Sequence, residues 1–534
     1  MNRLMRVDTR ALSKSHPDIP GVDTHAFRGY RSIMRTPAVA VLRVVILASL
    51  FPDPASAACE DLADLVLPGV AITALEAVPA GEFSLAGGRG GAREITDLPA
   101  FCRVAATLSP VEGSEIGIEL WLPEAAVWNG RYLALGNGGF AGSIGTNAML
   151  DPLRRGYAAS STDTGHSTPG GSFLLDEAQR IDFAYRAVHE MATQSKRLIR
   201  AFYDRSEDYA FFSGCSTGGR QALTAAQRFP ADFDGIVAGA PASYVSHLQG
   251  QQLWMSRVGY QAGGTPIPPE KFPLINDAVI AACDLDDGVG DLVIENPRAC
   301  AFDPRILLCA AGGGNACLTD AEVSTLASLY RGPVTSDGAS IFPGSVLGSE
   351  SGWGQMTGAQ PMALAVDIYR YTVFGDENWS YEDFDAGRDI PYAAGVIGEA
   401  LDANDPDLSP LAANGGKLLL YHGWADPGIT PYSTVSYYES VIDTMGADAA
   451  DSIRLFMVPG MGHCGGGEGP GTFDAIGVID QWVTSGTAPD RIVASRSRGG
   501  VVDRTRPLCP YPQIAVYGGA GSTDLAGNFV CRLP

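Results

Sequence analysis

Short apolar stretches recur along the chain in the pattern expected of buried β-strands. Residues 116–122 alternate in the way typical of a strand with one buried face. Residues 209–212 and 236–242 are continuous apolar runs, which favour strands buried on both faces. The amphipathic spacing over 183–202 predicts a long helix. Further predicted strands are 128–135, 157–162, 416–421 and 453–458.

The run at 209–212 leads into Gly214-Cys215-Ser216-Thr217-Gly218, a G-x-S-x-G pattern. The next segment, 220–228, favours helix. Strand, tight turn and helix form the context in which this pattern makes a nucleophile elbow, with Ser216 at the helix N-terminus. The pattern also occurs by chance in glycine-rich turns, so the prediction depends on finding partner residues.

An acid and a histidine follow in the expected order. Asp426 lies in the segment after the predicted strand 416–421, and His463 follows the strand 453–458. In a serine hydrolase the histidine takes the serine proton and the acid fixes the histidine tautomer. His422 competes for the role of base, but it precedes the acid at the same strand end, so we predict Ser216, Asp426 and His463 as the catalytic residues.

A glycine-rich loop, 136–140, follows the early strand 128–135. Loops in this position supply an oxyanion donor in such folds. We therefore predict an oxyanion hole made by the N–H of Thr217 with Gly138 and Gly139. A flexible turn with no catalytic part is the alternative.

These features predict an α/β class protein with the α/β-hydrolase fold and a large inserted lid domain. Residues 243–412 carry many turns, four cysteines and several aromatic residues, without a regular strand–helix order. We interpret them as the lid, and 58–242 with 413–534 as the catalytic domain. Four aromatic residues of the lid could line an acyl pocket or pack in a core, and the sequence leaves both open: Trp353, Trp379, Tyr381 and Phe384.

Residues 1–57 have the features of a targeting segment. Basic residues precede an apolar run, and Ala55-Ser56-Ala57 is an A-x-A cleavage site. The run is short for a membrane span and contains Arg43. A signal peptide starting at Met34 would have the usual length. We expect a mature protein that begins near Ala58 and is secreted or periplasmic.

The composition excludes some partners. Residues 1–57 carry eight basic and four acidic side chains, so their removal would change the formal charge from −23 to −27. Such a surface repels nucleic acids and anionic membranes, and we expect neither as a partner. We expect a monomer that acts on a small molecule.

An even number of cysteines in an exported chain predicts disulfides, here five. Proximity along the chain favours Cys283–Cys300, Cys309–Cys317 and Cys509–Cys531. If Ser216 and His463 touch, their neighbours Cys215 and Cys464 lie within bridging distance. Cys59 and Cys102 then remain as the fifth pair.

Acidic residues are closely spaced around a glycine turn at 283–293. Carboxylates interleaved with free carbonyl groups make an oxygen cage suited to Ca²⁺. The spacing is not that of an EF-hand, because Gly288 falls at loop position five. From the chemistry alone, a calcium site and a solvated acidic turn are both open.

Together these motifs resemble the tannase and feruloyl esterase family, which includes a mono(2-hydroxyethyl) terephthalate hydrolase. The resemblance spans almost the whole mature chain. It rests on the segments 214–220, 422–427 and 462–464 and on the acidic loop at 283–284.

The resemblance implies an α/β-hydrolase with a lid, a disulfide between the cysteines beside the serine and the histidine, and a structural Ca²⁺. The implied ligands are the side chains of Asp284, Asp287 and Asp291 with the carbonyls of Val289 and Val293. Leu292 departs from the family, which often has glycine there.

The expected activity is hydrolysis of esters of aromatic acids, feruloyl or galloyl, through an acyl-enzyme. Hydrolysis of mono(2-hydroxyethyl) terephthalate is an alternative, as is a serine peptidase on the same fold. A non-catalytic binding protein would need an incomplete triad, whereas all three predicted members are present.

Overall fold

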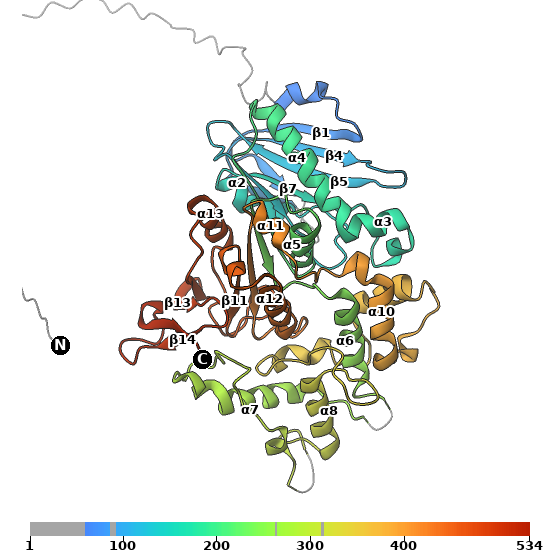
Figure 1. Cartoon of the computed structure of the whole chain (residues 1–534), viewed down its shortest axis with the longest axis vertical. Coiled ribbons are helices and arrows are strands. Elements are labelled where there is room, and N and C mark those ends of the chain that lie inside the picture. The colour runs from blue at the N-terminus through green and yellow to red at the C-terminus, as the bar shows by residue number, and fades with distance from the viewer. Residues whose placement is uncertain (1–58, 86–91, 262–263, 311–313) are drawn as a thin grey trace, which may run out of the picture. The chain divides into compact units, whose positions relative to one another are not determined.

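The computed structural model describes residues 59–85, 92–261, 264–310 and 314–534. Its central element is a nine-stranded sheet with the order β1-β4-β5-β7-β6-β8-β9-β10-β11 (Figure 1). The strands run parallel from β7 to β11, whereas β1, β4 and β5 join antiparallel. The nine strands are β1 (Val70–Val78), β4 (Phe101–Leu108), β5 (Ile116–Pro123), β6 (Arg131–Leu135), β7 (Ala158–Thr162), β8 (Tyr209–Cys215), β9 (Gly235–Gly239), β10 (Lys417–Gly423) and β11 (Ile453–Val458).

Helices cover both faces of the sheet, because successive strand residues point to opposite sides. In β6, Tyr132 and Ala134 belong to one apolar core, and Leu133 and Leu135 to the other. Helices α4, α5 and α12 pack on the first core, and α2 and α13 on the second. Their bounds are α2 (Thr146–Arg154), α4 (Ala187–Tyr203), α5 (Thr217–Arg228), α12 (Pro431–Met445) and α13 (Ala475–Ser485).

The strands predicted from the apolar pattern are confirmed, with ends that shift by a few residues. The predicted helix over 183–202 is confirmed, but its first turn is not α-helical. That turn is a π-helix, Asp182–Arg186, and only the remainder is α-helical. It coincides with carbonyl oxygens of Phe183 and Ala184 that accept hydrogen bonds from the buried side chain of Arg220.

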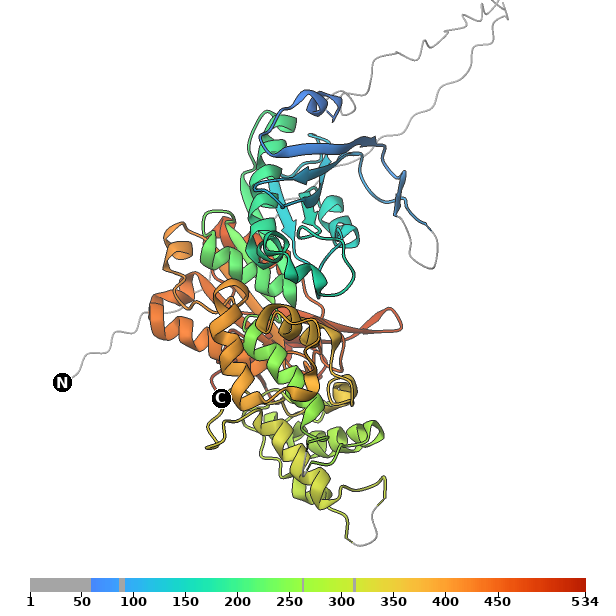
Figure 2. The same cartoon turned by 90° about the vertical axis from the view of Figure 1, so that its right-hand side faces the viewer.

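Between β9 and β10 the chain forms a helical region with its own apolar core. In the described part of 243–412, no strand joins the nine-stranded sheet. In both Figure 1 and Figure 2, α7 and α8 lie together, away from β1 and β4. The helices of this region are α6 (Val245–Arg257), α7 (Phe272–Cys283), α8 (Asp320–Arg331), α9 (Ala363–Ile368), α10 (Ala386–Leu401) and α11 (Ser409–Ala413).

Two hydrogen bonds join this helical region to the loop that follows β10. Gln252 Nε2 donates to the carbonyl oxygen of Gly428 at 2.9 Å. Thr430 Oγ1 donates to the carbonyl oxygen of Gly344 at 2.7 Å. The helical region therefore helps to fix the loop that carries Asp426.

Smaller elements complete the described chain. None of the described helices is long and apolar enough to cross a membrane. The remaining strands and α-helix of the described residues are β2 (Phe83–Leu85), β3 (Arg93–Ile95), α3 (Glu177–Ile181), β12 (Ile492–Arg498), β13 (Val501–Leu508), β14 (Ile514–Tyr517) and β15 (Phe529–Arg532).

Candidate active site

Ser216 occupies the turn between β8 and α5. Its backbone has φ 65° and ψ −122°, a conformation that is strained for a residue with a side chain. Gly214 is required here, because a Cβ on it would lie 2.5 Å from the carbonyl oxygen of Gly218. The Ser216 N–H donates to the carbonyl oxygen of Gly239 in the neighbouring strand at 3.0 Å. The strand–turn–helix geometry is that of a nucleophile elbow.

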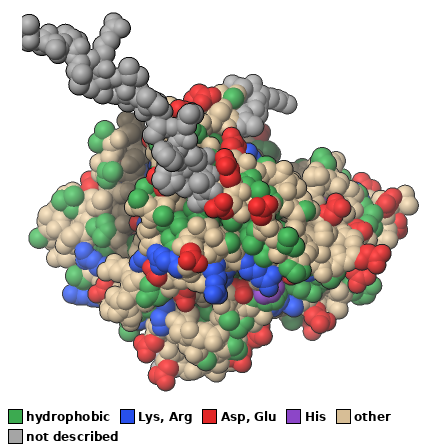
Figure 3. All heavy atoms as spheres, turned by 90° about the horizontal axis from the view of Figure 1, so that it is seen from above, with side chains coloured by type: hydrophobic (Ala, Val, Ile, Leu, Met, Phe, Trp, Pro, Cys, Tyr) green, Lys and Arg blue, Asp and Glu red, His purple; other side chains and the backbone are tan. Residues whose placement is uncertain are grey.

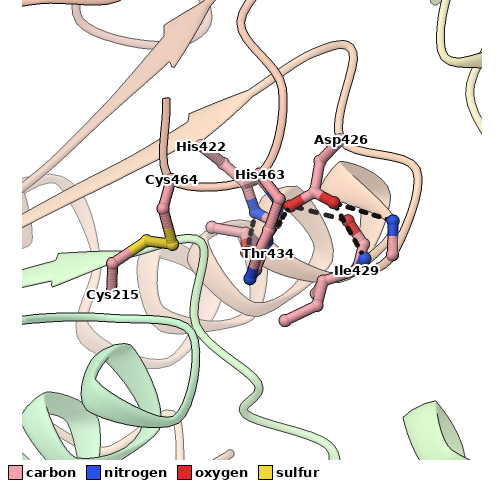
Figure 4. The surroundings of a disulfide bond; sticks show 8 residues. Cys215, His422, Asp426, Ile429, Thr434, His463 and Cys464 are labelled. Atoms are coloured by element: carbon pink, nitrogen blue, oxygen red, sulfur yellow. Dashed lines mark hydrogen bonds and ion pairs between the residues drawn. A yellow bond between two sulfur atoms is a disulfide. The ribbon is translucent and has the colours of Figure 1, made fainter. Parts of the chain in front are cut away.

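Asp426 contacts two histidines through one carboxylate oxygen (Figure 4). His463 Nδ1 donates to Asp426 Oδ2 at 2.6 Å, and His422 Nε2 lies 3.1 Å from the same oxygen. The other oxygen, Oδ1, accepts from the N–H groups of Gly428 and Ile429 at 2.8 and 3.0 Å. The acid is buried, whereas 36% of the His463 side chain is exposed.

These contacts shift both pKa values. Burial opposes ionisation of Asp426, but the hydrogen bonds from His422 and His463 outweigh it and hold the pKa of Asp426 below its usual value. Burial also lowers the pKa of His463, but the hydrogen bond and charge of Asp426 outweigh it, so this pKa is raised. A histidine that donates from Nδ1 to a carboxylate can act as a base through its other ring nitrogen.

A disulfide links the elbow to the loop that carries His463. Cys215 and Cys464 are bonded, with their Cα atoms 6.0 Å apart (Figure 4). Ser216 and His463 are the next residues along the chain from these cysteines. All ten cysteines are paired, in the pattern expected from the sequence: Cys59–Cys102, Cys215–Cys464, Cys283–Cys300, Cys309–Cys317 and Cys509–Cys531.

The glycine-rich loop after β6 lies against the start of α5. Thr217 Oγ1 donates to the carbonyl oxygen of Gly139 at 2.7 Å. A Cβ on Gly138 would meet nothing within 4 Å, so this part of the loop borders open space. Gly139 has φ 55°. Among the described residues, none accepts a hydrogen bond from the backbone N–H of Gly138 or Gly139. These two N–H groups are therefore able to donate hydrogen bonds to an oxyanion.

A cavity of about 610 Å³ lies beside His463. Its walls come from α7, the segment 292–297 after the acidic loop, the loop 347–352, the residues on either side of Asp426 and the histidine loop. Trp424 and Ile280 contribute apolar surface, and Asp277 and Glu468 contribute carboxylates. The volume lies in the range of small-molecule sites.

The four aromatic residues that the sequence left undecided belong to the core of the helical region. Trp353 and Phe384 are buried in that core, and Trp379 and Tyr381 pack against it. None of them is among the described residues that line the cavity beside His463.

The acidic loop is folded around its own backbone. Asp284 Oδ1 accepts from the N–H groups of Asp291 and Val293 at 3.0 and 3.2 Å. Asp287 Oδ1 accepts from the Val289 N–H at 2.8 Å. All the side chains and carbonyls that the resemblance names are oxygen donors, which fit Ca²⁺ in kind.

In the described conformation, the carboxylates of the loop are not arranged around a common point as Ca²⁺ ligands would be. The Asp291 carboxylate is held by Arg506 and by Arg504, the latter at 3.1 Å. Within the described residues, no three His, Cys, Asp or Glu side chains are placed to hold a metal ion. Both arginines contact Oδ2 of Asp291, whereas Oδ1 accepts from the N–H of Val293 at 3.2 Å. Leu292 has φ 67°, which explains why glycine would suit this position.

The structure thus brings Asp426 and His463 into contact and links the Ser216 turn to the histidine loop. Sequence reasoning considered His422 only as a competing base and missed its contact with the acid. The sequence feature that could have indicated this contact is the spacing of four residues between His422 and Asp426 across the end of a strand. The predicted targeting segment, 1–57, lies outside the described residues.

Comparison with known proteins places the chain among esterases. An uncharacterized esterase of Xanthomonas campestris is 38% identical over 94% of this chain and 95% of its own length. Mono(2-hydroxyethyl) terephthalate hydrolase of Piscinibacter sakaiensis is 31% identical over 82% of this chain and 85% of its own. The crystal structure of feruloyl esterase B from Aspergillus oryzae superposes with a TM-score of 0.83 and 32% identity, covering 89% of this chain and 99% of that one.

The sheet, its elbow and these neighbours define the class of α/β hydrolases. The sequence model of tannase and feruloyl esterase matches residues 102–532. The chain belongs to the tannase and feruloyl esterase family, and it is a carboxylic ester hydrolase.

Proposed function

We propose that this protein hydrolyses esters of aromatic acids through a triad of Ser216, His463 and Asp426. The observation that carries the proposal is the 2.6 Å hydrogen bond from His463 to Asp426, in a loop bonded by Cys464 to the residue before Ser216. The strained elbow at Ser216 supports the same assignment, because strain of this kind exposes the nucleophile.

In the proposed reaction, Ser216 Oγ attacks the ester carbonyl carbon while His463 Nε2 takes the hydroxyl proton. The bond to the alcohol oxygen then breaks, and His463 gives its proton to the leaving alcohol. Water attacks the acyl-serine in the same manner and releases the acid. Asp426 keeps the proton of His463 on Nδ1, so that Nε2 is free to act as the base.

The N–H groups of Thr217, Gly138 and Gly139 are the proposed donors to the oxyanion. Thr217 is the first residue of α5, where the N–H groups of a helix are free and its dipole favours negative charge. The hydrogen bond from Thr217 Oγ1 to Gly139 holds the two segments together.

Feruloyl or galloyl esters are the proposed substrates. The family is named for tannase and feruloyl esterase, and the neighbour with a crystal structure is named feruloyl esterase B. The alcohol part is assigned to the cavity beside His463, because the leaving alcohol takes its proton from this histidine. Ser216 and the proposed oxyanion donors are not among the described residues that line this cavity. Mono(2-hydroxyethyl) terephthalate is the alternative substrate, named for a relative of 31% identity.

The test is a substrate panel with the Ser216→Ala variant. Methyl ferulate, methyl gallate, mono(2-hydroxyethyl) terephthalate and a peptide amide would be compared by kcat/KM. We expect hydrolysis of at least one aromatic ester, and a loss of about 10⁴- to 10⁶-fold in kcat for Ser216→Ala at an unchanged Tm. Activity within tenfold of the wild type would remove Ser216 from the mechanism.

The acidic loop is a proposed site for a structural Ca²⁺. Asp284, Asp287 and Asp291 with the carbonyls of Val289 and Val293 would hold the ion, which would supply a positive charge to a loop rich in carboxylates. The support is the donor chemistry together with the family resemblance. No catalytic step depends on it.

Export from the cytoplasm is also part of the proposal. Five disulfides are typical of chains that fold in an oxidising compartment. The targeting features of residues 1–57 agree with this.

A further inference from the structure

His422 is a fully buried histidine that lies behind the proposed catalytic acid. Its side chain has no exposed surface, and it is the last but one residue of strand β10, just before the loop that carries Asp426. Its Nε2 lies 3.1 Å from Asp426 Oδ2 and 3.2 Å from the carbonyl oxygen of Ile429. Its Nδ1 lies 2.8 Å from Thr434 Oγ1.

These neighbours fix where the ring proton lies. A carboxylate and a carbonyl oxygen only accept hydrogen bonds, so Nε2 of His422 carries a hydrogen. Nδ1 faces the hydroxyl of Thr434, which can donate to it. His422 is therefore oriented as a donor toward Asp426, and the hydroxyl of Thr434 holds the other side of the ring.

His422 completes a set of four donors around the acid. His463 and His422 donate to Oδ2, and the N–H groups of Gly428 and Ile429 donate to Oδ1 (Figure 4). Three of the four come from the strand end and loop that also carry Asp426, so they hold the carboxylate independently of His463. A buried carboxylate with this many donors has one orientation.

We infer that His422 is a positioning residue that aims Asp426 Oδ2 at His463 and limits how strongly that oxygen attracts the imidazolium. The inference rests on the proposed triad. A second donor on Oδ2 neutralises part of its charge, so less of that charge acts on His463. Without this donor, protonated His463 would be stabilised further and the carboxylate could turn.

The described residues place few other charges near this pair. Among them, the groups that donate hydrogen bonds to Asp426, besides the two histidines, are backbone N–H groups. Asp277 and Glu468 line the cavity beside His463, and Glu468 is paired with Arg498. All of them are retained in the variants below, so a change in the pH profile can be assigned to His422.

The experiment compares two substitutions that each keep one half of the ring. In His422→Gln, the amide nitrogen occupies the place of Nε2 and can still donate to Asp426. In His422→Asn, the amide reaches only the place of Nδ1, so the contact with Thr434 can persist while the donor to Asp426 is lost. Thr434→Val is the control, since it removes the partner of Nδ1 alone.

For His422→Asn we expect kcat/KM on an aromatic ester to fall about 10- to 100-fold, mostly through kcat. We also expect the acidic limb of the pH profile, where kcat/KM falls as His463 becomes protonated, to move to higher pH by about half a unit or more. His422→Gln should restore most of the rate and the position of the limb. Thr434→Val should leave the limb where it is in the wild type.

Two results would overturn the inference. One is an unmoved acidic limb in His422→Asn, whatever its rate, and the other is the same displacement in all three variants. If His422→Asn does not fold, nitrogen-15 spectra of the wild-type histidines decide, because an Nε2 of His422 that carries no proton contradicts the assigned donor. Ser216→Ala separates the two claims: an active Ser216→Ala enzyme refutes the triad, whereas an inactive one with an unmoved limb in His422→Asn refutes only the role of His422.

Discussion

His463 is the residue whose protonation decides the proposed reaction. As a base it must be neutral, and the contact with Asp426 raises its pKa above the ordinary value of about 6.5. Activity should therefore fall as the pH drops through that raised pKa. Because the pKa of Asp426 is held low, the acid stays ionised over this range and adds no second limb. Measuring kcat/KM from about pH 5 to pH 9 checks this, and a plateau that continues below pH 6 would contradict it.

Asp426→Asn tests the choice of acid. An amide can donate to His463 and so favours the wrong tautomer, and we expect a loss of kcat of about 10⁴-fold with little change in KM. Asp163 and Asp474 serve as comparisons. Asp163 accepts from the N–H groups of Gly117 and Gly165, and Asp474 caps α13. If either Asp→Asn change at these positions were more damaging to kcat than Asp426→Asn, the acid would be wrongly assigned.

At the scale of elements, the elbow could be predicted from the residues adjacent to it in the sequence. The apolar run of β8, the glycines at 214 and 218 and the helix after them all act within about twenty residues, so the turn could be predicted. The contact of His422 with Asp426 could not, because it depends on how the loop after β10 turns back. The π-helical turn at Asp182–Arg186 was missed for the same reason, since it involves Arg220 from α5.

The disulfide between Cys215 and Cys464 joins two elements that are 249 residues apart. The chain-entropy model assigns such a bridge roughly 5 kcal/mol of stability. Its local effect is to hold the elbow near the histidine loop, on which proximity catalysis depends. Replacing both cysteines with alanine should therefore lower kcat more than it raises KM in protein that still folds.

The matched control for this prediction is the removal of Cys309–Cys317, whose cysteines are only 8 residues apart and lie in the helical region. It should lower Tm without lowering kcat. Equal losses of kcat in both double variants would show that the effect is general destabilisation. Peptide mapping under non-reducing conditions would check the bond itself.

The acidic loop gives a second prediction at this scale. If Asp284, Asp287 and Asp291 hold Ca²⁺, EDTA should lower Tm and added Ca²⁺ should restore it, because an ion that binds only the folded state stabilises it. Asp287→Asn should weaken this response and leave kcat nearly unchanged. An unchanged Tm together with no metal by elemental analysis would reject the site. The role of Asp291 would then be its ion pair with Arg506.

At the scale of the whole molecule, neither the order of the strands nor the packing of the helical region could be predicted from local sequence pattern. The parallel strands and the interruption after β9 could be read from apolar runs. The attachment of the helical region to the loop of Asp426 could not, because Gln252 and Thr430 bond to single carbonyl oxygens far along the chain. Such contacts carry no periodic signal.

Net charge is a property of the whole molecule with a kinetic consequence. The chain has a formal charge of −23, and no Lys or Arg is among the described residues that line the cavity beside His463. Basic side chains gather in a band on the face drawn in Figure 3. At distances beyond the Debye length of about 10 Å at 0.1 M salt, such charges are largely screened. At low salt, the net charge should slow the approach of anionic substrates.

We therefore expect kcat/KM for mono(2-hydroxyethyl) terephthalate, which carries a carboxylate, to rise about two- to fivefold as ionic strength increases from about 10 to 200 mM. Methyl ferulate, which is neutral near pH 7, should show little change and serves as the control for salt effects on the enzyme. A value for the anionic ester that falls with salt would mean that local positive charge, such as the basic band, dominates its approach. A parallel rise for both esters would instead indicate a salt effect on the protein itself, and the net charge would then not govern substrate encounter.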